Sequence, residues 1–73
     1  MSEEVLTNRL RVLRAERALT QADLAELTGT TRKSINAIET GRMVPSTLLA
    51  LKLVRALGVP LEEAFGLTSQ AMA

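Results

Sequence analysis

The feature that most restricts how this chain can fold is the segment from Thr20 to Gly41, which holds two short helical patterns separated by a tight glycine turn. Thr20 and Asp23 have the spacing of a capping box, in which each side chain accepts a hydrogen bond from the other residue's backbone N–H group. This box predicts a helix that begins at Gln21. Gly29 predicts the end of that helix, because glycine enters the left-handed backbone region freely. A second helix must follow at once.

The second helical pattern carries its own start and stop signals. Thr31 is the predicted N-cap, Ile35 and Ile38 are spaced to be buried together, and Gly41 predicts the end of the helix. The opposite side is polar and basic, and contains Arg32, Lys33, Asn36, Ala37 and Thr40. Two cations at a helix N-terminus oppose the helix dipole, and a phosphate-rich partner would offset that cost. The segment predicts a helix-turn-helix with a basic outer face; a plain helical hairpin with a solvated basic face is the alternative.

The residues before this motif also follow a helical pattern. A first helix is predicted from Ser2 to about Arg17, because Leu6, Leu10 and Leu13 form one apolar stripe. The acidic residues near its start suit the positive end of the helix dipole.

The remainder of the chain predicts two more helices. Residues 47–57 are apolar over most of the helix circumference, so we expect this helix to be central. Pro60 favours the start of a short fifth helix. The residues that the fifth helix is predicted to bury are Leu61, Ala64 and Phe65. The sequence thus predicts one all-α domain over residues 1–67 and a flexible C-terminal tail over residues 68–73.

The residue composition excludes several classes of function. The chain of 73 residues contains neither histidine nor cysteine, so it lacks the most common general base, a thiol nucleophile and the usual zinc ligands. It also lacks a glycine-rich phosphate-binding loop. We therefore expect no enzymatic activity, no metal site, no cofactor and no small-molecule ligand.

The charges are unevenly distributed along the chain, although the net charge is only +1. Between residues 30 and 55, five basic residues accompany a single acidic residue, Glu39, whereas the rest of the chain is net acidic. Such segregation is typical of a protein with a duplex-binding face. The single aromatic residue, Phe65, argues against a binder of single strands and is expected in the core. Without a signal peptide or a membrane-spanning run, we expect a cytoplasmic protein that does not bind membranes.

Three segments in a fixed order resemble the lambda-repressor-like helix-turn-helix proteins of phage and bacteria, also called the Cro or XRE type. They read L-T-Q-A-D-L-A at 19–25, G-T-T-R-K-S-I at 29–35 and A-I-E-T-G at 37–41. The flanking segments 8–14, 45–59 and 60–65 are similar to the family's first, fourth and fifth helices. The resemblance covers nearly the whole chain and implies a compact five-helix DNA-binding domain in which the second and third helices form the motif.

The resemblance implies that the second helix of the motif enters the major groove of duplex DNA and that residues near its N-terminus reach base edges. The expected base-reading residues are Arg32, Lys33, Asn36 and Ala37. Arginine or lysine suits guanine, asparagine suits adenine, and alanine can contact the methyl group of thymine. For Arg32 and Lys33 a phosphate contact is the alternative. The expected phosphate-binding residues are Gln21, Thr31, Ser34, Thr40 and Arg42.

The family also implies two features outside the reading face. It commonly pairs an arginine at the position of Arg14 with a glutamate at that of Glu39, which ties the first helix to the end of the third; two solvated charges are the alternative. It usually has glycine where this chain has Ala18. If the chain turns there with positive φ, alanine costs on the order of 1 kcal/mol.

The function that the resemblance implies is sequence-specific transcriptional regulation of the repressor type by a bacterial or phage-encoded protein. The expected partner is double-stranded operator DNA, bound as a symmetric homodimer on a palindrome. We expect the fifth helix and the tail to form the dimer surface. The alternative is a protein-interaction module, such as an antitoxin-like protein that holds a second protein and for which DNA binding is secondary.

Overall fold

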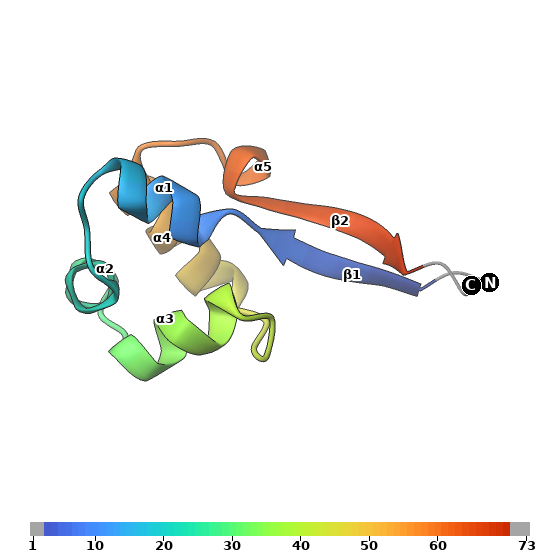
Figure 1. Cartoon of the computed structure of the whole chain (residues 1–73), viewed down its shortest axis with the longest axis horizontal. Helices are drawn as coiled ribbons and strands as arrows, with labels where there is room; N and C mark the ends of the chain where they lie inside the picture. The colour runs from blue at the N-terminus through green and yellow to red at the C-terminus, as the bar shows by residue number, and fades with distance from the viewer. Residues whose placement is uncertain (1–2, 71–73) are drawn as a thin grey trace.

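The computed structural model describes residues 3–70 and shows a bundle of five helices from which a two-stranded ribbon projects (Figure 1). In chain order the elements are β1 (Glu3–Asn8), α1 (Leu10–Glu16), α2 (Gln21–Thr28), α3 (Arg32–Glu39), α4 (Thr47–Leu57), α5 (Leu61–Ala64) and β2 (Phe65–Gln70). The molecule measures 39 × 22 × 21 Å. The ribbon lies along the longest of these dimensions (Figure 1). None of the helices within residues 3–70 is long and apolar enough to cross a bilayer.

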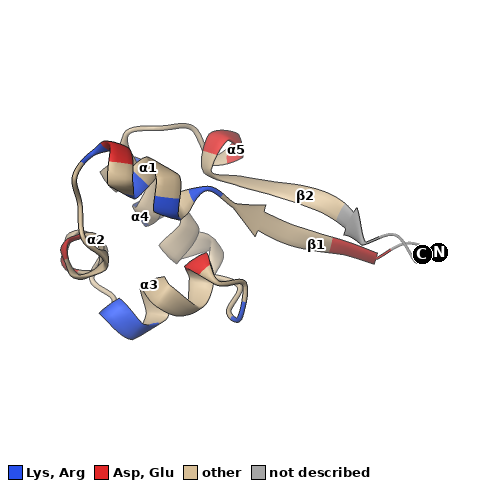
Figure 2. Ribbon diagram, viewed as in Figure 1, with Lys and Arg blue, Asp and Glu red and all other residues tan. Residues whose placement is uncertain are grey.

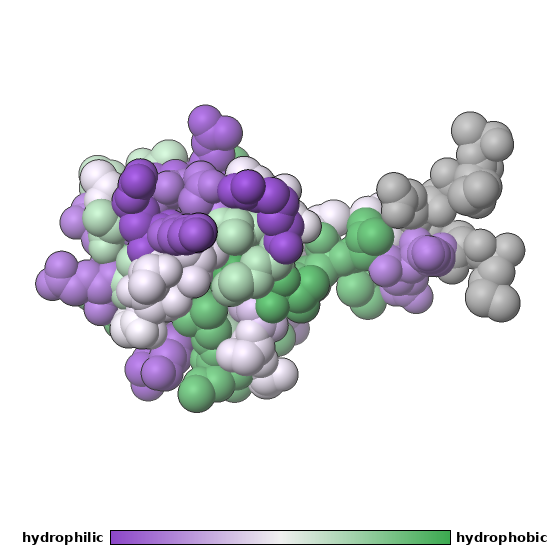
Figure 3. All heavy atoms as spheres, turned by 90° about the horizontal axis from the view of Figure 1, so that it is seen from below, coloured by the Kyte–Doolittle hydropathy of each residue, from purple (hydrophilic) through white to green (hydrophobic). Residues whose placement is uncertain are grey.

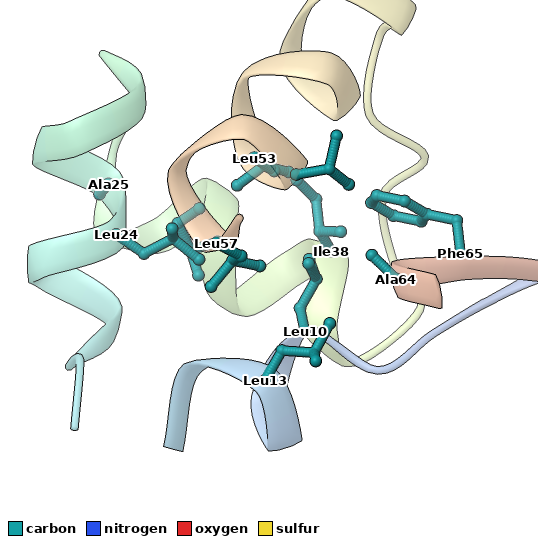
Figure 4. Close-up of a cluster of buried hydrophobic side chains, with 11 residues drawn as sticks. Leu10, Leu13, Leu24, Ala25, Ile38, Leu53, Leu57, Ala64 and Phe65 are labelled. Carbon is teal, nitrogen blue, oxygen red and sulfur yellow. The ribbon is translucent and has the colours of Figure 1, made fainter. Parts of the chain in front are cut away.

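All five helices contribute to one apolar core (Figure 4). Its buried members are Leu10, Leu13, Leu24, Ala25, Ile35, Ile38, Leu53, Val54, Leu57, Ala64 and Phe65. Phe65 is 9% exposed, which confirms its prediction as a core residue. Because Ile35 and Ile38 of α3 belong to the same buried cluster as residues of α1, α2 and α4, the core fixes the orientation of α3 relative to the rest of the bundle.

The five predicted helices are present, but the description all-α is not exact, because the two ends of the described chain form an antiparallel pair of strands. β1 and β2 pair with Leu6 opposite Leu67. The β-branched residues Val5 and Thr7 flank Leu6 in β1 and favour extended backbone. The stripe of leucines that suggested a helix here is a local pattern, whereas the strand depends on a partner from the opposite end of the chain.

Helix α1 begins at Leu10, after the strand, and the predicted start at Ser2 lies outside the described residues. The Asn8 side chain marks this boundary. Its Oδ1 accepts a hydrogen bond from the Leu10 N–H over 3.1 Å, and its Nδ2 donates to the Ile38 carbonyl oxygen over 3.0 Å. Asn8 thus ties the base of the ribbon to the last turn of α3.

The segment predicted as a flexible tail, residues 68–73, overlaps the ribbon. Residues 68–70 lie in β2, where they pair with residues 3–5 of β1. The rest of the predicted tail, residues 71–73, lies outside the described residues. Backbone pairing with β1 therefore extends the ordered domain beyond residue 67.

The predicted boundaries of the helix-turn-helix are confirmed. The Thr20 hydroxyl accepts from the Asp23 N–H over 3.0 Å, and the Asp23 carboxylate accepts from the Thr20 N–H over 2.9 Å. The bond from the Thr20 backbone, followed by that with its side chain, holds the pKa of Asp23 below its usual range. The capping bonds of the charged carboxylate stabilise the fold above the pKa that this group has in the unfolded chain. This stabilisation is lost as the pH falls through its pKa in the folded chain. Gly29 ends α2 in the left-handed region with φ 70°.

Helix α4 is only partly enclosed, although its apolar circumference predicted a central helix. One side packs in the core, whereas Leu48 and Leu51 on the other side are 65% and 50% exposed. Leu61 of α5 was predicted to be buried and is 42% exposed. A chain this small does not have enough elements to cover both sides of α4. The uncovered leucines form part of an apolar surface.

Ala18 turns the chain between α1 and α2 with φ 54°, and it is the single non-glycine residue with positive φ in the described part of the chain. Ala18→Gly is expected to raise the free energy of unfolding by roughly 0.5 to 1 kcal/mol, because glycine lacks the Cβ that opposes this backbone conformation. Urea denaturation measures the change. Ala15→Gly, on the exposed side of α1, is the control and is expected to lower stability. A loss of stability in both variants would contradict the prediction.

Candidate nucleic-acid interface

Helix α3 has one side in the core and the other in solvent. Ile35 and Ile38 are 0% and 1% exposed and hold the helix in place. Arg32 and Lys33 project from its first turn, and both are exposed. The first turn of α3 is coloured blue, for Lys and Arg, in the ribbon of Figure 2. Neither side chain forms an ion pair with an acidic residue of the described chain. The cationic end of α3 is therefore open to a ligand.

The hydroxyl groups at the start of α3 are bonded to each other. Thr31 caps the helix by accepting from the Ser34 N–H over 3.1 Å, and its hydroxyl donates to the Ser34 Oγ over 3.0 Å. The Thr31 hydroxyl is thus occupied, whereas the Ser34 hydroxyl keeps its own proton for a further acceptor. Of these two predicted phosphate ligands, Ser34 has the available donor.

The last turn of α3 carries a second polar group. Arg42 donates from Nη2 to the Asn36 Oδ1 over 2.9 Å and from Nε to the Thr40 Oγ1 over 3.1 Å. Ala37 is half-buried beside them. Asn36 is the one predicted base-reading residue whose side chain has a protein partner within residues 3–70.

The ion pair between Arg14 and Glu39 is present in the structure. Arg14 Nε lies 2.9 Å from Glu39 Oε2, and the two side chains are 15% and 4% exposed. Arg14 Nη2 also donates to Glu39 Oε1 over 3.2 Å, and its Nη1 donates to the Leu19 carbonyl oxygen over 2.9 Å. The hydrogen bonds with Glu39 raise the pKa of Arg14. Because the pair is bidentate and almost buried, it fixes α1 against the end of α3.

Gln21 joins this pair from the first turn of α2. Its Nε2 donates to Glu39 Oε1 over 3.0 Å. Glu39 therefore accepts hydrogen bonds from both α1 and α2, and the first turn of α2 is held against the end of α3. The Gln21 side chain thus braces the end of α3 from the first turn of α2.

Sequence reasoning missed Arg11, which is exposed on α1. Together with Asn36 and Thr40 it lines a shallow depression between α1, α2 and α3. The spacing between Arg11 and Arg14 could have indicated that Arg11 lies on the side of α1 that faces α3, because residues three apart share one side of a helix. Within the described residues, the acidic side chains do not gather into a group that could hold a metal ion.

Comparisons with known proteins agree with this geometry. A family model described as helix-turn-helix matches residues 10–63. The uncharacterized HTH-type transcriptional regulator YgzD of Bacillus subtilis is 40% identical over 65 residues, which cover 89% of this chain and 98% of that protein. A similar regulator of Methanocaldococcus jannaschii, MJ0272, is 43% identical over 60 residues, 82% of this chain and 91% of that one. The crystal structure of the restriction-modification controller protein C.AhdI from Aeromonas hydrophila matches with a TM-score of 0.71 and 37% identity, over 74% of this chain and 82% of that one.

Proposed function

This chain belongs to the Cro/XRE-type helix-turn-helix family of DNA-binding transcriptional regulators, which are not enzymes. We propose that it represses transcription as a homodimer on a palindromic operator. The observation that carries this proposal is the open cationic end of α3. Arg32 and Lys33 stand on a helix that is capped at Thr31 and anchored by two buried isoleucines. Such a helix can enter the major groove without rearrangement of the bundle. Bound at a promoter, the dimer would exclude polymerase.

We assign the side chains around α3 to two kinds of DNA contact. Those that reach base edges are Arg32, Lys33, Asn36 and Ala37. Those that contact backbone phosphate are Gln21, Thr31, Ser34, Thr40 and Arg42. The hydroxyl protons of Thr31 and Thr40 would exchange their present acceptors for a phosphate oxygen. Polar groups lie at both ends of α3, with Arg32 and Lys33 exposed at its first turn and Arg42 exposed after its last, and this arrangement supports the division. The base contacts would give sequence preference, and the phosphate contacts would give affinity that depends on salt.

Selection of bound sequences from a random duplex pool tests this function. We expect a palindromic sequence whose half-sites lie about 34 Å apart, because a two-fold dimer places its recognition helices about one helical turn apart. The affinity for the selected duplex should fall with salt, with a slope of log K against log salt near 0.9 for each phosphate neutralised. A pool without enrichment, together with a flat salt titration, would contradict the proposal and favour a module that binds a protein partner.

The proposed dimer surface is an apolar area that we call the leucine patch. It keeps the fifth helix of the surface expected from the sequence, but β1, β2 and α4 take the place of the tail. Its members are Leu6, Val44, Leu48, Leu51, Leu61 and Leu67, which are 37%, 73%, 65%, 50%, 42% and 69% exposed. Four of them line one groove between β1, α4 and α5. Leu67 adjoins it opposite Leu6 on the ribbon, and Leu48 lies one turn from Leu51 on α4. Figure 3 shows apolar atoms that continue from the helical body to the base of the ribbon.

The occupant that best fits the leucine patch is a second copy of this chain. The patch exposes on the order of 500 Å² of apolar surface, which is large for a monomer of this size and a substantial part of the roughly 800 Å² per partner in a standard interface. Charges of both signs lie beside it, with Arg55 on α4 and Glu62 on α5. A two-fold contact can bring the arginine of one copy to the glutamate of the other. The ribbon, as a two-stranded sheet, would also gain stability from a partner.

Leu51→Glu is expected to raise the dimer dissociation constant at least about 30-fold, because it places an unpaired charge in the proposed interface. Sedimentation equilibrium over a range of concentrations measures this change. Leu27→Glu is the matched control, because Leu27 on α2 is 60% exposed and lies outside the leucine patch. Circular dichroism verifies that both variants stay folded. An unchanged dissociation constant for Leu51→Glu would contradict the placement of the interface.

A further inference from the structure

Arg42 lies after α3, yet its side chain returns to the helix. The chain turns at Gly41, with φ 78°, and the Arg42 N–H donates to the Ala37 carbonyl oxygen over 2.8 Å. This turn places the guanidinium group over the last turn of α3. There Nη2 lies 2.9 Å from the Asn36 Oδ1, and Nε lies 3.1 Å from the Thr40 Oγ1.

This contact sets the orientation of the Asn36 amide. A guanidinium group carries only donors, so the Asn36 atom that faces Arg42 must be the carbonyl oxygen and not the NH₂ group. Thr40 keeps Arg42 in position, because its hydroxyl donates to the Asn36 carbonyl oxygen of the backbone over 2.8 Å and accepts from Arg42 Nε. The Asn36 NH₂ group has no protein acceptor within residues 3–70. It therefore remains available to a ligand.

We propose that Arg42 is a positioning residue that makes Asn36 select guanine instead of adenine. This inference rests on the proposed function, because it requires Asn36 to reach a base edge. It gives Arg42 a role in specificity beyond the phosphate contact assigned to it above.

The reason lies in what each base presents in the major groove. An asparagine reads adenine with both ends of its amide: the oxygen accepts from N6–H₂, and the nitrogen donates to N7. Here Arg42 occupies the oxygen, and its positive charge stands where the N6 hydrogens of adenine would arrive. Guanine presents two acceptors, N7 and O6, which suit the free NH₂ group and the neighbouring cation. Guanine is thus favoured at the base that Asn36 meets.

Selection from a random duplex pool with three variants tests the inference. Asn36→Ala identifies the base pair concerned, because preference should disappear there and persist elsewhere. At that base pair the natural chain is expected to prefer guanine over adenine by about fivefold or more. In Arg42→Ala the preference should move towards adenine, while the other positions keep theirs. Arg11→Ala is the matched control, because Arg11 lines a depression together with Asn36 but forms no bond with it. The preference of this variant at the Asn36 base pair should remain that of the natural chain.

Three results would overturn the inference, and they differ from a failure of the proposed function. One is a natural chain that prefers adenine at the Asn36 base pair. Another is an Arg42→Ala variant that binds all sequences more weakly by the same factor and keeps its preference at the Asn36 base pair. The slope of log K against log salt would then be smaller by about 0.9, and Arg42 would contact phosphate only. The third is an equal change of preference in Arg11→Ala. If the natural chain enriches no sequence at all, the proposed function and this inference both fail.

Discussion

Replacing both Arg32 and Lys33 with alanine is expected to weaken binding to the selected operator by about 2 to 6 kcal/mol, because each good base contact contributes about 1 to 3 kcal/mol of discrimination. Both side chains are exposed at the first turn of α3 and have no acidic partner in the described chain. Their removal should therefore leave the fold intact. Fluorescence anisotropy with the operator and with an unrelated duplex measures the loss of preference as well as of affinity.

The matched control exchanges the two residues, as Arg32→Lys with Lys33→Arg. This variant keeps the net charge but alters the geometry of each donor, since a guanidinium group bonds bidentately and an ammonium group does not. If the two residues read bases, the exchanged variant should lose operator preference while its binding to the unrelated duplex is unchanged. If the preference of the double alanine variant equals that of the natural chain, Arg32 and Lys33 do not read bases.

Arg14→Ala is expected to lower the free energy of unfolding by about 3 to 5 kcal/mol, because it leaves the Glu39 carboxylate without its cation. Glu39 is 4% exposed, and the amide of Gln21 would be its one remaining side-chain donor in the described chain. The pKa of Arg14 is raised in the folded chain. The stability that its charged guanidinium group contributes is therefore complete below the pKa of the unfolded chain, and it is lost only as the pH rises through the pKa of the folded chain. The loss should thus be observed in urea denaturation at neutral pH.

The double variant Arg14→Met with Glu39→Leu is the control for this prediction. Buried ion pairs that are replaced by apolar residues of similar volume often cost little. The double variant is therefore expected to be more stable than Arg14→Ala, although Gln21 loses its acceptor. If Arg14→Ala is as stable as the natural chain, the pair does not fix α1 to α3. A double variant that is less stable than Arg14→Ala would indicate that Glu39 acts mainly through Gln21.

The sequence predicted the motif and its boundaries correctly because the forces that set them are local. Thr20 and Asp23 are three residues apart, and Gly29 ends α2 through its own backbone conformation. The same holds for Thr31, which caps α3 through a residue three positions on. The partners in each of these interactions lie within one helical turn, so residue type and spacing suffice to predict them.

The ribbon and the leucine patch could not be predicted in this way. Leu6 fits a helical stripe with Leu10 as well as it fits a strand opposite Leu67, and only the partner strand distinguishes the two. The exposed leucines of α4 are as apolar as its buried ones. Which of them are covered depends on how many elements the chain has available to pack around α4.

The residues that we propose to read bases were chosen from their places on the polar side of α3, but this choice did not reveal which atoms of Asn36 are available to a base. As a residue type, asparagine suits adenine through both ends of its amide. The bond from Arg42, six residues later, occupies the oxygen and leaves the nitrogen. The turn at Gly41 brings Arg42 and Asn36 together. Residue type alone does not reveal which atoms of a side chain are already hydrogen-bonded to another residue.

By itself the sequence determined the helix-turn-helix, its caps and the basic face of α3, because capping, turn formation and helical periodicity act between neighbouring residues. The tertiary structure alone decided that the ends of the chain pair as strands, that one side of α4 stays uncovered and that Arg42 orients Asn36. The first two features arise because segments distant in the chain compete to cover the same surface. The third arises because side chains more than one helical turn apart compete for the same hydrogen-bonding atom. That competition is resolved only when the whole domain has packed.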